Sequence, residues 1–415
     1  MSLETKKTSK GDAVLAFLLG ISVCEGISMM FSVGNTSFSF AEVFSPLVFL
    51  FFCLTRLNEI VGFVRKIPIG FKLFAIIIVL SVIPGVVYFS SIAVMSRYVV
   101  GLISLFIVLT MAANIYVLKQ SRDCVVKGLL IGVVLNTLFS IICYISFTRG
   151  EVITLSTVFP HPSFFVPGYN FRAQGFFLEP SHYIRFIATV LLVVVSQSKV
   201  KSFVSKALFF VMLLLVLALS TSGTVVILAV GVAIFAMMRK NDRNPIYRII
   251  LAILITAIAL LVYFAVFGSD SLKLSGLVGK ILSGADISSE GNSERYNAMI
   301  ESLGYIGGAL IGCGWNMVGT LFDFHGSKTV AAFSDVLEMT LELGIVGVFV
   351  YAISIISLIL RLLRKKSDYS IALALSVAMI FAIQIGTDYA FNSCIMLLFG
   401  LTIAELSGVE DNMVK

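Results

Sequence analysis

The sequence predicts an all-α, polytopic membrane protein with about 12 transmembrane helices and two long loops on the non-cytoplasmic side. Three observations support this fold class. First, 59% of the 415 residues are hydrophobic, only 13% are charged, and the mean hydropathy is +1.04. A soluble protein has roughly 25% charged and 45–50% apolar residues. Second, apolar runs of about 15–23 residues recur along the chain. Third, Lys and Arg are concentrated in alternate connections between these runs.

The apolar runs define the predicted spans, because a bilayer needs roughly 20 residues of helix. Lys6, Lys7 and Lys10 precede the first run, but no small-residue cleavage site follows it, so we expect a retained helix rather than a signal peptide. The spans are expected near residues 13–33, 38–54, 73–93, 97–118, 125–147, 183–197, 203–219, 224–238, 249–267, 339–360, 370–386 and 389–406.

The basic residues predict the orientation. Of the 30 Lys and Arg residues, 22 fall in one set of connections and eight in the other. Because Lys and Arg favour the cytoplasmic side, this split predicts cytoplasmic amino and carboxyl termini and an even number of spans. The net charge of +7 then reflects contact with anionic lipid rather than with nucleic acid. The basic set comprises segments 1–12, 55–72, 119–127, 198–206, 239–248 and 361–366, with Lys415.

This topology divides the chain into five parts. Two outer connections are long, whereas all cytoplasmic ones are short. Since functional residues concentrate on loops held by a rigid scaffold, two long loops on one side predict a site there. The parts are 1–147 with five spans, the first long periplasmic loop 148–182, 183–267 with four spans, the second long periplasmic loop 268–335, and 336–415 with three spans.

All three histidines of the chain, His161, His182 and His325, lie in these two loops. Histidine is the side chain that titrates near neutrality, so its concentration there favours proton-transfer chemistry. The alternative is that histidine is costly in lipid and is placed in loops for that reason alone. Six cysteines without paired spacing indicate neither a disulfide framework nor a zinc site.

The end of the first loop is rich in charge. Arg172, Glu179, His182 and Arg185 fall within fourteen residues at a membrane edge. Glu179 and His182 share a face if a helix begins at Glu179 or Pro180. The alternative is an interfacial belt, with the arginines extending to lipid headgroups.

The second loop contains Arg295 on a predicted helix, a glycine-rich run from Gly304 to Gly314, and then His325. Next comes a helix whose first turns carry acids three and four residues apart on one face. A solvated helix start explains these acids equally well, because carboxylates are stabilised at the positive end of a helix. The acids are Asp335, Glu338 and Glu342.

Three sequence patterns lie between about Phe171 and Tyr351. One is Arg172-x-x-Gly175-x-x-x-Glu179-Pro180-Ser181, and another is Arg295 on a short helix followed by Gly312-Cys313-Gly314-Trp315. The third is Ser334, nine residues, and then Gly344-Ile345-Val346-Gly347. Together they resemble the bacterial O-antigen polymerase family, the lipid-linked oligosaccharide repeat-unit polymerases, which is related to the O-antigen ligases.

The resemblance implies a membrane glycosyltransferase of lipopolysaccharide biosynthesis in the bacterial inner membrane. Such a polymerase transfers a growing glycan from undecaprenyl pyrophosphate to the sugar of a lipid-linked repeat unit at the periplasmic face. The implied partners are undecaprenyl-pyrophosphate-linked oligosaccharide, membrane lipid and a chain-length regulator, but no nucleic acid. No cofactor is expected, and since the chain has no Asp-x-Asp pair, no divalent metal either.

The implied reaction assigns roles to the residues in the loops. Arginine's planar fork suits phosphate oxygens, and a base near the acceptor hydroxyl completes the displacement. The expected residues are Arg172, Arg185 and Arg295 for pyrophosphate, Glu179, His182 and His325 for the base, and Asp335 and Glu338 as further candidates.

Two other functions compete with the polymerase. An O-antigen ligase acting on lipid A-core is the nearer one. However, Phe333 stands where the ligases have a histidine, and Thr221-Ser222-Gly223 lacks an arginine that the family often shows. A transporter or flippase of lipid-linked oligosaccharide is the other. It predicts charged residues inside several spans, and the chain has few beyond Glu25 and Glu42.

Overall fold

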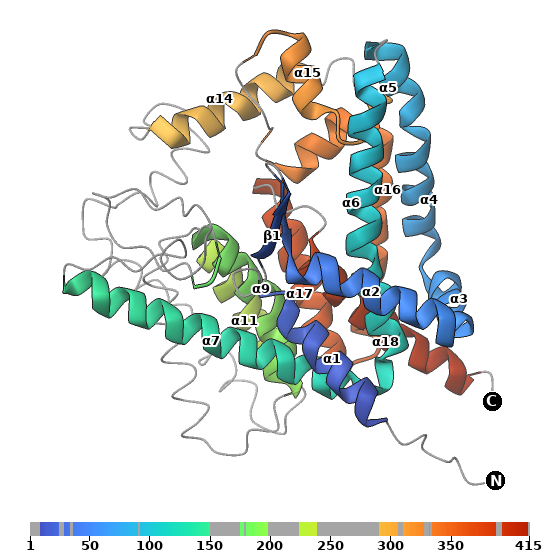
Figure 1. Ribbon diagram of the computed structural model, residues 1–415, viewed down its shortest axis with the longest axis vertical. Helices are drawn as coiled ribbons and strands as arrows, with labels where there is room; N and C mark the ends of the chain where they lie inside the picture. The colour runs from blue at the N-terminus through green and yellow to red at the C-terminus, as the bar shows by residue number, and fades with distance from the viewer. Residues whose placement is uncertain are drawn as a thin grey trace.

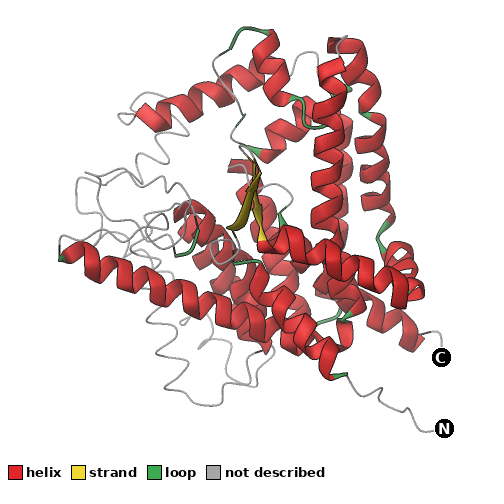
Figure 2. Ribbon diagram, viewed as in Figure 1, coloured by secondary structure: helices red, strands yellow, loops and turns green. Residues whose placement is uncertain are grey.

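The computed structural model describes residues 9–24, 29–33, 36–89, 92–149, 175–177, 180–197, 224–238, 290–305, 310–327, 332, 334–386 and 392–413. Within these residues the elements are helices and one two-stranded β-ribbon (Figures 1 and 2). In order they are α1 (Lys10–Ser22), β1 (Met29–Val33), β2 (Thr36–Ser39), α2 (Phe40–Thr55), α3 (Leu57–Lys66), α4 (Ile69–Leu80), α5 (Val82–Phe89), α6 (Ile92–Val117), the 3-10 helix η2 (Lys119–Ser121), α7 (Arg122–Thr148), α9 (Pro180–Gln197), α11 (Thr224–Met238), α14 (Glu290–Tyr305), α15 (Val318–Phe324), α16 (Asp335–Arg364), α17 (Asp368–Gly386) and α18 (Ser393–Met413).

The prediction of a helical membrane protein is confirmed in this coarser form, whereas the count of twelve spans is not. Five helical segments are long and apolar enough to cross a bilayer, and a sixth is reached if the bent pair α2–α3 counts as one span. Two shorter apolar helices, His182–Gln197 and Ser393–Gly408, add to these. The predicted spans 203–219 and 249–267 lie outside the described residues. The five segments are Ile69–Phe89, Met95–Val117, Lys119–Thr148, Asp335–Arg364 and Asp368–Ile385.

The first predicted span, 13–33, is wrong as a continuous helix. α1 ends at Ser22, and Met29–Val33 instead forms a strand that pairs antiparallel with Thr36–Ser39. Val33 is the partner of Thr36, so only Gly34-Asn35 separates the strands, and such dipeptides are typical of two-residue hairpins. The apolar character of the run therefore belongs to a helix and a strand.

Glu42, a carboxylate expected inside the second span, has a structural role at the start of α2. Its side chain accepts a hydrogen bond from the Ser39 N–H at 2.8 Å, and the Ser39 hydroxyl accepts one from the Glu42 N–H at 3.3 Å. This capping box satisfies two N–H groups that the first turn of a helix leaves without intrahelical partners. Glu42 therefore needs no functional explanation.

The predicted cytoplasmic segment 55–72 contains the helix α3, which is bent by 111° from α2 at Arg56. Ile60 and Phe63 face the protein core, whereas Leu57 in the first turn is exposed. An amphipathic helix that ends in basic residues is typical of a position at the membrane surface.

The bundle is built around α6 and α16. α6 packs on α2 and α18, α16 packs on α4 and α17, and α17 packs in turn on α9 and α11. Polar side chains join α2 to α6 inside the bundle. The Asn114 amide donates to the Ser45 carbonyl at 2.7 Å, and the hydroxyls of Ser45 and Thr110 are 2.9 Å apart. Such interhelical hydrogen bonds hold helices together where lipid provides no hydrophobic driving force.

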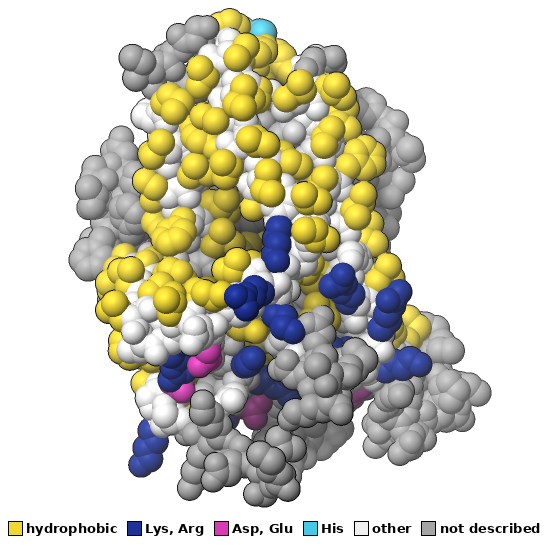
Figure 3. All heavy atoms as spheres, turned by 90° about the vertical axis from the view of Figure 1, so that its right-hand side faces the viewer, with side chains coloured by type: hydrophobic (Ala, Val, Ile, Leu, Met, Phe, Trp, Pro, Cys, Tyr) yellow, Lys and Arg dark blue, Asp and Glu magenta, His cyan; other side chains and the backbone are white. Residues whose placement is uncertain are grey.

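The two ends of the bundle differ in charge. Figure 3 shows Lys and Arg side chains gathered below a broad apolar surface, and both chain termini lie at this end in Figure 1. We call it the basic end, and the end that carries α14, α15 and the start of α16 the distal end. The basic end includes Arg56, Lys119, Arg122, Arg364 and Lys365.

Candidate active site

The distal end is organised by a break in α16. Gly344 has a φ of 73° and a ψ of 175°, so the helix is interrupted there. Residues 310–314 fill the break: the Cys313 N–H donates to the Leu341 carbonyl at 2.7 Å, and the Gly314 N–H to the Glu342 carbonyl at 2.9 Å. The carbonyls that the break leaves without helical partners are thereby satisfied.

Glycine is required on both sides of this contact. A Cβ atom on Gly344 would meet the Leu310 carbonyl oxygen at 2.3 Å, and one on Gly312 would meet the Glu342 carbonyl oxygen at 2.3 Å. Gly312 also has a positive φ, 79°. Two of the sequence patterns, the Gly312–Trp315 run and the Gly344–Gly347 run, are therefore in direct contact.

The same loop is attached to the neighbouring helices. The Trp315 N–H donates to the Ser81 hydroxyl at 3.0 Å, and the Asn316 amide donates to the Arg97 carbonyl at 2.9 Å. Ser81 joins α4 to α5, and Arg97 lies in the first turns of α6. Part of the second predicted loop is thus fixed against three helices.

The buried acids of α16 contribute to this attachment. The Glu342 carboxylate lies within hydrogen-bonding reach of the backbone N–H groups of Asn316, Met317 and Val318, where α15 begins. Glu338 accepts a hydrogen bond from the Ala332 N–H at 3.1 Å. Asp335 is only 1% exposed. Burial excludes the explanation that Asp335 and Glu342 are merely solvated acids at a helix start.

Ser334 and Asp335 belong to a polar cluster between α16 and α17. The Ser334 hydroxyl caps α16 and donates to the Ile385 carbonyl at 2.8 Å. Nearby, the Tyr351 hydroxyl donates to Gln384 Oε1 at 2.8 Å. A carboxylate inside a membrane protein is costly, so Asp335 remains a functional candidate, but this cluster lies below the exposed surface.

His325 lies at the exposed end of α15 among aromatic side chains. Its ring stacks on Tyr305, with centroids 4.7 Å apart, and its Nε2 is 3.5 Å from the Tyr88 hydroxyl. The Tyr305 hydroxyl donates to Glu301 Oε1 at 3.0 Å. Burial, and then the neighbouring Glu301, raises the pKa of Tyr305, so its phenol stays protonated. Three segments of the chain therefore meet at one imidazole.

Arg97 supplies a positive charge at the same end of the bundle, where it contacts α15. Its guanidinium donates to the Thr320 hydroxyl at 2.7 Å and lies 3.6 Å from the Asp323 carboxylate. The two side chains are 50% and 63% exposed, so water screens their ion pair and both remain accessible to a ligand. In the sequence, Arg97 stands out only as one of eight basic residues on the predicted outer side, more than 200 residues from His325.

We define the distal cluster as Tyr88, Arg97, Glu301, Tyr305, Asp323 and His325. An imidazole, a guanidinium and two carboxylates at the end of an apolar bundle can move a proton and hold an anion. Within the described part of the chain, no group of three or more His, Cys, Asp or Glu side chains is arranged to hold a metal ion.

Two of the expected residues near the end of the first predicted loop lie away from the distal cluster. His182 and Arg185 lie on α9, which packs on α7, α11 and α17 and lies apart from α15 in Figure 1. Arg185 is 2% exposed, so it is a buried residue of the bundle rather than part of an interfacial belt. The described helices do not bring His182 and His325 together.

The remaining expected residues lie outside the described part of the structure. Arg172, Glu179 and His161 lie outside the described residues, as does the side chain of Arg295, whose backbone belongs to α14. Their predicted roles therefore stay predictions. Comparison with known proteins adds nothing to them: no family model matches the chain, and no curated protein matches it either.

Proposed function

We propose that this protein is a membrane glycosyltransferase of the O-antigen polymerase type, and that its reaction takes place at the distal end. The observation that carries this proposal is the distal cluster itself. An exposed imidazole at the end of α15 and an exposed guanidinium on α6, which contacts α15 at Thr320 and Asp323, lie at the same end of the bundle. Residues 310–314, which precede α15, are anchored to the break in α16. Groups held on rigid elements can be positioned for chemistry.

In the proposed reaction His325 is the general base. Its Nε2 removes the proton of a sugar hydroxyl on one lipid-linked repeat unit, and that oxygen attacks the anomeric carbon of the growing glycan. The bond between this carbon and the pyrophosphate oxygen breaks, so undecaprenyl pyrophosphate leaves as an anion. Tyr305, whose ring stacks on the imidazole with centroids 4.7 Å apart, orients it.

The leaving pyrophosphate needs positive charge. Arg97 supports this role because its guanidinium is half exposed and its partner Asp323 is screened by water. Arg172 and Arg295 are proposed as further contacts from the two loops, and Arg185, which is buried in the bundle, is the least suited of the four. A planar guanidinium can bind two phosphate oxygens at once.

A transporter or flippase of lipid-linked oligosaccharide is a second candidate. Burial of Arg185 and Asp335 favours it, because ionisable groups inside a membrane bundle often mark a substrate path. The exposed distal cluster has no evident role in a transporter, and we therefore rank the transporter function second.

Deletion of the gene, followed by a gel of surface polysaccharide, separates the alternatives. A polymerase predicts surface glycan limited to single repeat units, which return to full length when the wild-type gene is restored. Complete loss of attached repeats would indicate a ligase. Repeats retained on the cytoplasmic face would indicate a flippase. Unchanged polysaccharide would contradict all three.

A second experiment tests the reaction directly. Purified protein in liposomes should lengthen lipid-linked repeat units with no other protein present, and free undecaprenyl pyrophosphate should accumulate one for each repeat added. Liposomes that contain the lipid-linked repeats but no protein are the control. Absence of lengthening in protein that remains folded would contradict the proposal.

A further inference from the structure

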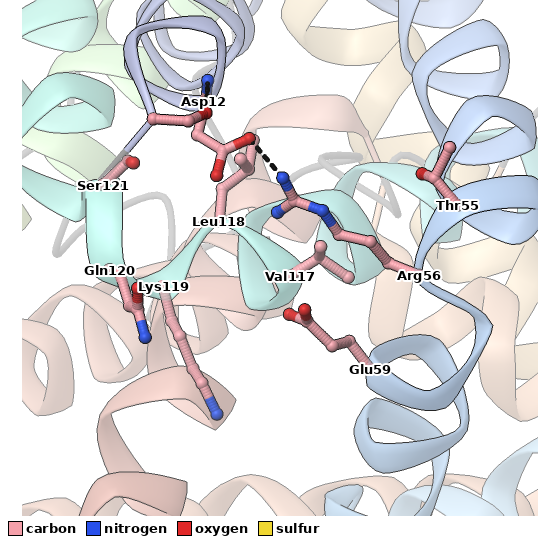
Figure 4. A pocket seen from close by; sticks show the side chains of 10 residues that line it. Asp12, Thr55, Arg56, Glu59, Val117, Leu118, Lys119, Gln120 and Ser121 are labelled. Carbon is pink, nitrogen blue, oxygen red and sulfur yellow. Dashed lines mark hydrogen bonds and ion pairs between the residues drawn. The ribbon is translucent and has the colours of Figure 1, made fainter. Parts of the chain in front are cut away.

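A polar pocket lies at the basic end, far from the distal cluster. It has a volume of about 410 Å³, within the roughly 300–1,000 Å³ of small-molecule sites. Its walls come from the start of α1, the bend between α2 and α3, and the turn between α6 and α7 (Figure 4). The lining residues are Ser9, Asp12, Thr55, Arg56, Glu59, Val117, Leu118, Lys119, Gln120 and Ser121.

The pocket contains two positive and two negative side chains, and only one of each sign takes part in an ion pair. Arg56 and Asp12 form an ion pair at 2.6 Å and stabilise the wall. Lys119 and Glu59 line the same pocket, but neither makes an ion pair with any described residue. The Lys119 ammonium lies over the Tyr116 ring, 4.8 Å from its centroid. Figure 4 shows Glu59 and Lys119 on different walls, with the Glu59 carboxylate toward the middle of the view and the Lys119 ammonium below it.

A third polar group in the wall is unsatisfied. Ser121 is 4% exposed, and its hydroxyl has no hydrogen-bond partner within the part of the chain that the structure describes. A buried hydroxyl without a partner costs free energy, so a ligand atom that bonds to it gains a contact without displacing another. The pocket therefore offers a cation, an anion and a hydroxyl to one ligand.

The position of the pocket indicates a lipid rather than a soluble ligand. Leu54 and Leu57 flank the lining residues Thr55 and Arg56 in the sequence, and they are 88% and 57% exposed. Exposed leucines suit acyl chains. The basic end is also where the apolar surface of the bundle gives way to Lys and Arg, the level of lipid headgroups (Figure 3).

We propose that this pocket binds the headgroup of a phospholipid that carries both a phosphate and a primary amine. The phosphate contacts Lys119, and the ammonium contacts Glu59. Basic pockets suit purely anionic lipids, but here the charges of the lining residues cancel, because Asp12 and Glu59 balance Arg56 and Lys119. A zwitterion of the phosphoethanolamine kind matches both signs.

Native mass spectrometry of delipidated protein in detergent tests this proposal. Dioleoyl phosphatidylethanolamine should bind roughly five- to tenfold more tightly than dioleoyl phosphatidylglycerol, which lacks the amine. Dioleoyl phosphatidylcholine should also bind more weakly, because its quaternary amine has no N–H to donate. Soluble phosphoethanolamine, which lacks acyl chains, should compete poorly.

Three variants locate the site. Glu59→Gln should remove the preference for the ethanolamine lipid over the glycerol lipid. Lys119→Gln should weaken both by roughly tenfold, since it removes the contact to phosphate. Ser121→Ala should weaken lipid binding without lowering the melting temperature of the lipid-free protein, because its hydroxyl has no partner there. Lys72→Gln, at the same end but outside the pocket, is the matched control.

Two outcomes would overturn the proposal. Equal binding of the ethanolamine and glycerol lipids, unchanged in Glu59→Gln, would show that the amine is not recognised. Competition by soluble phosphoethanolamine as strong as that of the lipid would assign the pocket to a soluble ligand. Both results are independent of the glycan-transfer proposal, which concerns the opposite end.

Discussion

The two ends of the bundle use charge in opposite ways. At the basic end Glu405, 14% exposed, is 2.9 Å from the Arg122 guanidinium and 3.7 Å from the Lys365 ammonium. It also accepts a hydrogen bond from the Ser370 hydroxyl at 2.8 Å. At the distal end Arg97 and Asp323 are 3.6 Å apart and more than half of their combined surface remains in water. The charges around Glu405 are saturated with contacts, whereas Arg97 and Asp323 at the distal end stay accessible.

This difference separates structural charges from reactive ones. Glu405 joins α18 to the α6–α7 turn and to the α16–α17 turn, so its partners are fixed by packing. Buried charges whose partners are removed are costly. Exposed ion pairs contribute little to stability, so residues such as Arg97 and His325 are free to be selected for chemistry. We therefore expect substitutions at the two ends to affect different measurements.

The largest effect is expected for His325→Gln. Removing a general base costs on the order of 10²–10⁴-fold in rate, whereas an exposed substitution changes stability by less than about 0.5 kcal/mol. The turnover of lipid-linked repeat units by purified protein should fall accordingly, with the melting temperature unchanged.

His182→Gln is the matched control for this variant, because His182 lies on α9 away from the distal cluster. Its turnover should stay near normal. The reverse result, normal turnover in His325→Gln and severe loss in His182→Gln, would assign the base to α9. It would contradict the conclusion that the reactive groups lie at the distal end.

The next effect concerns stability at the basic end. Glu405→Gln removes the carboxylate that contacts Arg122 and Lys365, and we expect a loss of roughly 2–3 kcal/mol in the free energy of unfolding, below the 3–5 kcal/mol of fully buried pairs because Arg122 is partly exposed. Thermal unfolding in detergent measures it.

Asp323→Asn at the distal end is the control for Glu405→Gln. Its ion pair is exposed, so a loss of less than about 1 kcal/mol is expected. Equal destabilisation by both substitutions would show that the two ends do not differ as their burial indicates.

The sequence predicted the bundle better than the site. Apolar runs place α7 and α11 within a few residues, because lipid imposes the same requirement on every spanning helix. The prediction of the first span was wrong because hydropathy does not distinguish one long helix from a helix followed by a strand pair. The dipeptide Gly34-Asn35 is typical of a turn and could have indicated the difference.

The distal cluster was predicted only in part. His325 was expected from its residue type, but Tyr88 and Arg97 lie at the ends of apolar helices more than 200 residues away in the chain. Their proximity follows from how residues 310–316 fill the break in α16, a contact between distant segments that no local pattern encodes.

A smaller effect should follow from Gly344→Ala, which tests how the distal end is supported. A non-glycine residue at this φ and ψ costs roughly 1–3 kcal/mol, and the new Cβ would meet the Leu310 carbonyl. The melting temperature and the turnover should both fall, because the loop that carries the cluster is displaced.

Gly304→Ala is the matched glycine control, because a Cβ at Gly304 would meet nothing within 4 Å. It should leave stability unchanged or raise it slightly, since alanine favours helix. If Gly344→Ala behaves in the same way, the loop is not held by the break in α16.

The smallest expected effect concerns Cys313, whose thiol reports whether residues 310–314 are docked in the break of α16. The thiol is buried, and burial together with the nearby Glu342 carboxylate raises its pKa to about 12. Because the thiolate is the reactive species, a maleimide at pH 7.5 should label native protein at least about 10³-fold more slowly than protein unfolded in detergent. The experiment needs a variant in which the other five cysteines are replaced by serine or alanine.

The raised pKa of the thiol also predicts how the labelling rate depends on pH. Between pH 7 and pH 9 the labelling rate of native protein should rise about tenfold for each pH unit and show no plateau, since the thiol remains almost fully protonated throughout. Adding Gly344→Ala should increase the rate at every pH, because a displaced loop exposes the thiol. Rapid labelling of the native protein without that substitution would mean that residues 310–314 are not docked. The exposed distal cluster would then lack the rigid support that distinguishes it from an ordinary surface loop.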